Sequence, residues 1–154
     1  MSSLALKGSI LAGVLIAIAA PASAQRLDLS LSTQVITFPS SDPDTVPLVS
    51  ATPLQVTYRV RQNNGAPWSL TVLAGGDLVA GGSQIDISNV TWAATPAPPF
   101  QNGTLSKTVA QRVAGGTDNV NPDTIGSITF RLANSWTYST GIYTQTVLFT
   151  LSAP

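Results

Sequence analysis

The chain has 154 residues, its 7 basic and 7 acidic side chains balance, and it contains neither Cys nor His. Such sparse and balanced charge provides no basic stripe for a phosphate backbone, so nucleic acid is excluded as an expected partner. Without cysteine no disulfide can hold a folded domain, so its hydrophobic core and its sheet hydrogen bonds must do so.

The first 24 residues have the three parts of a secretory signal peptide. Lys7 gives a basic start, residues 8–20 are apolar, and a small-residue site follows at Ala22-Ser23-Ala24. The alternative is an uncleaved membrane anchor, which requires a longer apolar run of about 18 residues or more. We therefore predict a signal peptide over 1–24 and a mature protein that is periplasmic, on the cell surface or extracellular, with no membrane span.

Residues 25–154 are expected to form a single all-β domain. Pro, Gly, Ser and Thr interrupt every window of helical length, and apolar residues recur at every second position. The first predicted strand has Leu27, Leu29 and Leu31 on one face, and a loop rich in Ser, Asp and Pro follows over 39–53.

The clearest strand covers 54–61, where apolar residues alternate with polar ones. Residues 63–65 have the sequence Asn-Asn-Gly, which favours a turn because both residue types tolerate positive φ. Trp68, Leu70 and Val72 face one way on the next strand, so the two strands are predicted to form a hairpin.

The remaining elements are expected in a regular order along the chain. They are short strands between 85 and 92, a proline-rich crossing segment over 95–100, an edge strand over 105–113, a loop over 115–123, and strands over 128–132 and 143–151. About seven to nine strands separated by regular turns indicate an Ig-like antiparallel β-sandwich, with a closed barrel as the alternative.

The residue types that most enzyme active sites require are missing from this sequence. Without His and Cys the chain cannot build a Ser-His-Asp or Cys-His arrangement, or a common zinc site. Its acidic residues are all Asp, and most lie beside Pro, Gly, Asn or Ser, where Asp usually supports a turn. We therefore expect no enzymatic activity and no cofactor.

One loop is rich in oxygen side chains, the ligands that Ca²⁺ prefers. Asp118, Asn119, Asn121 and Asp123 lie together in it, but their spacing departs from that of an EF-hand loop. An Asx turn before Pro122 explains the same residues. Both interpretations stay open, and no metal is assigned.

The aromatic residues divide into core positions and candidate binding positions. Tyr58 and Trp68 are in phase with their apolar neighbours, which predicts that they are buried. Trp136 and Tyr138 lie in a turn and are the best candidates for exposed rings that stack on a polysaccharide. Trp92 is a further candidate for the same role.

Gly141, Tyr143, Val147, Phe149 and Leu151 form the pattern GxYxxxVxFxL near the C-terminus. The glycine and tyrosine resemble the corner of Ig-like domains, in which the tyrosine hydroxyl bonds back to nearby backbone. The whole pattern is similar to the last strand of small secreted bacterial β-sandwich proteins related to spore coat U and pilin-type subunits. The resemblance implies a structural role at the cell surface, with exchange of a strand between subunits.

In strand exchange, an alternating segment of one subunit fills a gap in a sheet of the next subunit. Leu27, Leu29 and Leu31 have the alternation and the position for such a donor, although pairing within their own domain is the alternative. The last strand of the chain looks complete, which argues against a gap beside it.

Together these patterns predict an exported, non-enzymatic structural or adhesive protein, similar to a pilin subunit, whose partners are further copies of itself or other surface proteins. The alternative is an extracellular carbohydrate-binding module. It would bind polysaccharide through Trp136, Tyr138 and Trp92.

Overall fold

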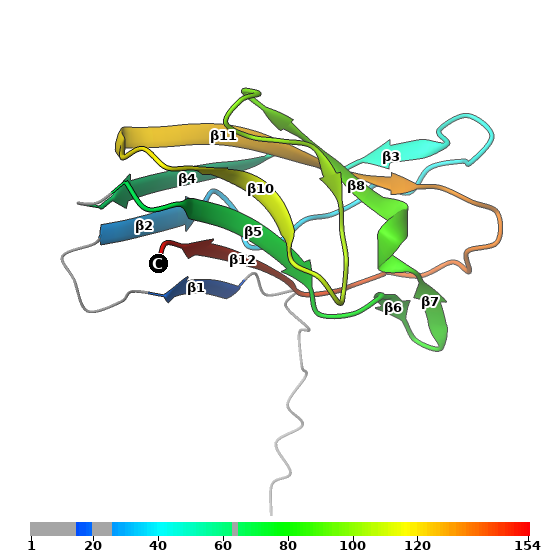
Figure 1. Ribbon diagram of the computed structural model, residues 1–154. Helices are drawn as coiled ribbons and strands as arrows, with labels where there is room; N and C mark the ends of the chain where they lie inside the picture. Colours follow the sequence, from blue (N-terminus) through cyan, green and yellow to red (C-terminus); the bar gives the residue numbers. More distant parts are fainter. Residues whose placement is uncertain (1–14, 20–25, 63–64) are drawn as a thin grey trace, which may run out of the picture.

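The computed structural model describes residues 15–19, 26–62 and 65–154, and within these ranges it contains strands and a single 3-10 turn (Figure 1). The elements are β1 (Leu15–Ala19), β2 (Arg26–Leu31), β3 (Leu48–Ser50), β4 (Leu54–Arg61), β5 (Trp68–Ala74), β6 (Leu78–Ala80), β7 (Ser83–Ile85), η1 (Ile87–Asn89), β8 (Val90–Thr95), β9 (Gly103–Thr104), β10 (Gln111–Gly116), β11 (Val120–Ala133) and β12 (Val147–Ser152).

The strands form two facing sheets and a small hairpin. The first sheet, called the β5 sheet below, has the order β1-β12-β5-β10. The second, called the β11 sheet, has the order β2-β4-β11-β8-β9, with β3 paired to β11. β6 and β7 pair separately. All of these pairings are antiparallel except that of β1 with β12, so the predicted all-β antiparallel sandwich is confirmed.

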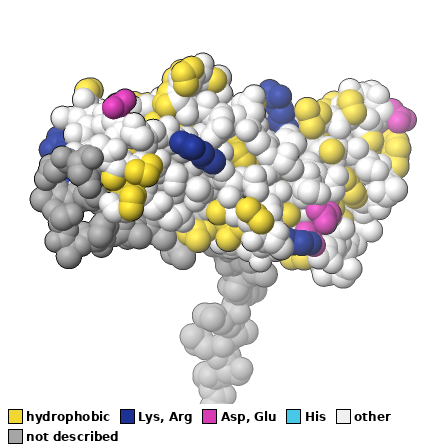
Figure 2. Space-filling view, in the orientation of Figure 1, with side chains coloured by type: hydrophobic (Ala, Val, Ile, Leu, Met, Phe, Trp, Pro, Cys, Tyr) yellow, Lys and Arg dark blue, Asp and Glu magenta, His cyan; other side chains and the backbone are white. Residues whose placement is uncertain are grey.

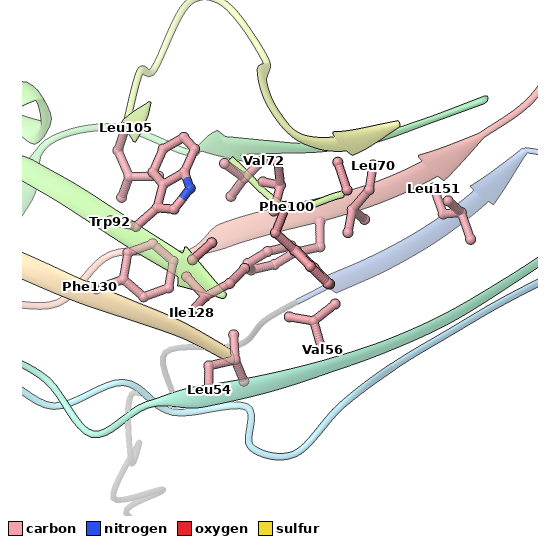
Figure 3. Close-up of a cluster of buried hydrophobic side chains, with 14 of the residues drawn as sticks. Leu54, Val56, Leu70, Val72, Trp92, Phe100, Leu105, Ile128, Phe130 and Leu151 are labelled. Carbon is pink, nitrogen blue, oxygen red and sulfur yellow. The ribbon is translucent and has the colours of Figure 1, made fainter. Parts of the chain in front are cut away.

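The core lies between the two sheets because apolar residues alternate along their strands. Along β4 the side chains of Leu54, Val56, Tyr58 and Val60 are buried, and along β5 those at alternate positions from Trp68 are buried too. Figure 3 shows how side chains of both sheets meet in this layer. Each fully buried aliphatic side chain stabilises the fold by about 1.5–3 kcal/mol relative to its exposed state.

The predicted hairpin of β4 and β5 is wrong, because the two strands belong to opposite sheets. β4 pairs with β2 and β11, whereas β5 pairs with β10 and β12. Their apolar faces still meet one core, since they face each other across the sandwich. The other boundaries differ locally: β3 lies within the predicted loop 39–53, β10 begins at Gln111, and β11 begins at Val120 inside the predicted loop 115–123.

The two sides of the sandwich are closed in different ways. On the side that we call the closed side, the proline-rich segment 96–101 crosses between the sheets. Phe100 is buried there and forms a bridge with Ala114, while the Gln101 amide donates to the Val113 carbonyl at 2.9 Å. On the opposite side, called the open side, the β11 sheet ends in β2, and the β5 sheet ends in β1, which pairs with β12 (Figure 1).

Gly126 on β11 makes the closed side possible. A Cβ atom at this position would lie 2.1 Å from the Phe100 ring, so only a residue without a side chain allows the ring to pack against β11. At Gly82, in contrast, an added Cβ would meet nothing within 4 Å, and this residue lies on the surface.

Gly126→Ala should therefore destabilise the protein, because the added methyl group displaces the Phe100 ring. Overpacking of this kind costs about 1–3 kcal/mol, measured as the free energy of unfolding in urea. The matched control Gly82→Ala should stay within about 0.5 kcal/mol of wild type. Equal unfolding midpoints for the two variants would show that the packing of the Phe100 ring does not require glycine at position 126.

Candidate functional sites

The best-connected carboxylate is a structural one. Asp77 accepts hydrogen bonds from the Lys107 ammonium at 2.6 Å, the Gln84 amide at 2.8 Å and the Ile87 backbone N–H at 3.0 Å. The hydrogen bond from Lys107 is the main cause that lowers the pKa of Asp77, and the same bond raises the pKa of Lys107. Both groups thus stay charged at neutral pH, which suits an ion pair rather than a proton-transfer pair.

The other carboxylates do not assemble into a reactive cluster. Asp28 lies 3.0 Å from Arg26, Asp123 pairs with Arg59, and the Asp86 side chain accepts from the Ser88 N–H at 2.9 Å. No group of three or more Asp residues that could hold a metal ion occurs in the part of the chain that the structure describes.

The oxygen-rich loop uses its side chains to bind neighbouring strands. The side-chain amide oxygen of Asn119 accepts a hydrogen bond from the Gln62 backbone N–H at 2.7 Å. The side-chain amide oxygen of Asn121 accepts one from the Arg61 guanidinium at 3.2 Å. The backbone carbonyl of Asp118 accepts from the Trp68 indole at 3.0 Å. These contacts, with the ion pair of Asp123, fasten the start of β11 to the ends of β4 and β5.

Trp92 is a core residue, and the prediction that it contacts a ligand is wrong. Its side chain is 2 % exposed, and its indole N–H donates to the Gln101 carbonyl at 2.8 Å. The indole also lies so close to Gly103 that a Cβ there would be 2.4 Å from the ring. The physical reason is its phase on β8, where it faces inward with Val90 and Ala94.

Trp136 has an exposed ring, and Tyr138 does not. The Trp136 side chain is 68 % exposed, and its indole N–H donates to an Asp44 carboxylate oxygen at 2.9 Å. Asn134 anchors the same turn, because its side-chain amide donates to the carbonyls of Ser41 and Val46. Tyr138 is partly buried and packs against the core. Of the three aromatic residues predicted to bind a ligand, Trp136 is the most exposed.

The segment before β12 is fixed by Tyr143. Its hydroxyl donates to the Ser139 carbonyl at 3.0 Å, four residues upstream, and its ring packs against the core. The next residue, Thr144, exchanges two backbone hydrogen bonds with Val79 on β6. A Cβ at Gly141 would lie 2.9 Å from the side chain of Ala80, so this turn is packed closely against the β6–β7 hairpin.

The three leucines predicted as an exchanged strand lie in β2 and pair within their own chain. Leu27 is opposite Val60 and Leu29 is opposite Tyr58 in an antiparallel pairing with β4. Leu27 and Leu29 are buried, and Leu31 is partly buried against the core. In this structure they thus complete their own sheet and do not project as a free donor strand.

β12 has a second neighbour that sequence reasoning missed. On one side it pairs with β5, and on the other β1 pairs with it in parallel over residues 148–152. β1 lies within the apolar part of the predicted signal peptide, whose small-residue site at 22–24 falls outside the described residues. Among the described residues, the outer edge of β12 is thus paired through residues 15–19, which lie within the predicted signal peptide.

Comparison with known proteins provides no identification: no family model, curated protein or solved structure matches this chain. Within the described residues, no helix is long and apolar enough to cross a membrane. The described residues offer two candidate sites, the outer edge of β12 and the exposed ring of Trp136.

Tyr143→Phe should lower the free energy of unfolding by about 0.5–1.5 kcal/mol, because it removes one hydrogen bond and keeps the ring. Urea denaturation measures this loss. Tyr138→Phe is the matched control, since no described residue accepts a hydrogen bond from the Tyr138 hydroxyl, and it should leave the stability unchanged. If both variants lose the same amount of unfolding free energy, the hydrogen bond to Ser139 makes no specific contribution to stability.

Proposed function

We propose that this chain is an exported, non-enzymatic structural or adhesive protein of the cell surface or its exterior. It acts as a pilin-like subunit with an Ig-like sandwich, and it joins further copies of itself or other surface proteins by strand addition along β12. The observation that carries the proposal is the outer edge of β12, whose pairing within the described part of the chain comes from residues 15–19, which are expected to leave with the signal peptide.

The difference between the two sides of the sandwich supports this role. The closed side is sealed by Phe100 and the crossing segment, which belong to the expected mature chain. The open side depends on β1 for the pairing of β12. Removal of residues 1–24 would leave a row of backbone N–H and C=O groups on β12 without partners, and such a row can pair with a strand of another chain.

The sequence of β12 supports the same conclusion. Edge strands of monomeric proteins are usually protected by charged side chains, proline or bulges. β2 carries Arg26 and Asp28, and β10 carries Arg112 together with an irregular register. β12 has the sequence VLFTLS, which contains no charge and no proline, and its pairing with β5 is regular. An unprotected edge of this kind is suited to association.

The surface fits a structural protein. Figure 2 shows charged side chains as isolated spots on a mostly uncharged face. In the described residues, the acidic groups with resolved pKa shifts are held below their ordinary range, so neither is adjusted for proton transfer near neutral pH. With few charged groups and no acid adjusted for proton transfer, the described part of the chain is better suited to packing and backbone pairing than to catalysis.

The exported protein, recovered from producing cells, should form concentration-dependent oligomers, and Thr150→Lys should abolish them. Thr150 lies between the buried Phe149 and Leu151 on β12, so the added charge stands on the outer face at the free edge. Size-exclusion chromatography with light scattering measures the assembly. Thr129→Lys, on the outer face of the central strand β11, is the control and should assemble like wild type. A monomer at every concentration contradicts the proposal.

A carbohydrate-binding module is the second candidate, favoured by Trp136. A flat, exposed indole can stack on a sugar ring, and Asp44 at its N–H edge provides a carboxylate that can accept hydrogen bonds from sugar hydroxyl groups. Tyr138 is close in sequence but has less exposed surface.

If this second function holds, the protein should bind members of a glycan array, and Trp136→Ala should weaken that binding at least about tenfold, a loss of about 1.4 kcal/mol. Tyr138→Phe keeps its ring and should bind normally. An array without any signal from the wild-type protein leaves strand-mediated assembly as the sole proposal.

A further inference from the structure

The N-terminal strand β1 matches the edge of β12 residue by residue. The parallel register places Ile16 opposite Phe149 and Ile18 opposite Leu151, the two buried positions of β12. The small residues of β1, at positions 17 and 19, lie opposite Thr150 and Ser152. The two Ile residues of β1 are therefore paired with buried residues of β12, and its two Ala residues are paired with partly buried ones.

The position of β1 also brings it to the other sheet. β1 pairs with β12 and also contacts β2, so it lies on the open side of the sandwich and reaches both sheets (Figure 1). The backbone N–H and C=O groups of β12 point alternately to its two edges, and those on one edge form hydrogen bonds with β5. Those on the other edge can pair with one strand at a time, so β1 and a strand from another chain must exclude each other.

We propose that residues 15–19 are an internal plug of the β12 edge. While the segment is attached, it occupies in cis the site for a neighbour's strand and keeps the precursor monomeric. Its removal with the signal peptide opens the site. The inference rests on the proposed strand-addition function and adds its regulation. The edge of β12 binds a short apolar strand with large residues at alternate positions. The first strand to occupy it is residues 15–19 of the same chain.

The test uses the full chain, residues 1–154, purified without processing. Ile16→Asp/Ile18→Asp places a charge at each position paired with a buried residue of β12, Phe149 or Leu151, and an unpaired charge beside the apolar core is unfavourable. The plug should detach, so that the amide hydrogens within 148–152 that are not bonded to β5 exchange at least about tenfold faster than in wild type, and the variant assembles. The matched control Ala17→Asp/Ala19→Asp should keep slow exchange and stay monomeric.

Two further measurements keep the result interpretable. Amide exchange in β11 should be equal in all three proteins, which shows that the sandwich itself is folded. A synthetic peptide of residues 14–20, added to the Ile16→Asp/Ile18→Asp chain, should restore slow exchange at 148–152 and reverse assembly. Fast exchange at 148–152 in the wild-type chain, or equal exchange in the two double variants, would overturn the plug.

The same measurements separate the plug from the proposed function. If the Ile16→Asp/Ile18→Asp chain exposes its β12 amides but remains a monomer, the plug stands and strand-mediated assembly fails. If the exported protein assembles while the 148–152 amides of the full chain exchange rapidly, assembly stands and the plug fails.

Discussion

The packing of three aromatic rings between the sheets is the interaction on which the rest of the structure depends. Tyr58 on β4 lies 5.1 Å from Trp68 on β5 and 5.6 Å from Phe100, measured between ring centroids. The first contact joins the two sheets, and the second joins them to the segment that seals the closed side. Since Gly126 makes room for Phe100, these residues together fix the spacing of the sheets.

The elements that sequence reasoning identified correctly are those with an unbroken alternation. The bounds of β4 and the burial of Tyr58 and Trp68 follow directly from period-two patterning. The partner of each strand does not follow from it. The Asn-Asn-Gly sequence at 63–65 suggested a local hairpin, but the sheet that a strand joins is decided by contacts far away in sequence, such as the pairing of β4 with β11.

The candidate sites were partly predictable for the same reason. The exposure of Trp136 follows from its place in a polar turn, whereas Trp92 faces inward on β8, and its contacts with Gly103 and the Gln101 carbonyl are formed by the segment that follows β8. The edge of β12 was missed because residues 15–19 were interpreted solely as a targeting segment. Their alternation of Ile and Ala was the signal that could have linked them to a strand.

The Asp77–Lys107 ion pair has a consequence for the conditions under which this protein works. The pair lowers the pKa of an acid and raises that of a base, and the sequence has no His or Cys. Asp and Lys ordinarily titrate well outside the neutral range, so acidification of the surroundings to about pH 5 gives the side chains little to respond to. The Asp77–Lys107 pair thus keeps both of its charges when the surroundings change from neutral pH to about pH 5.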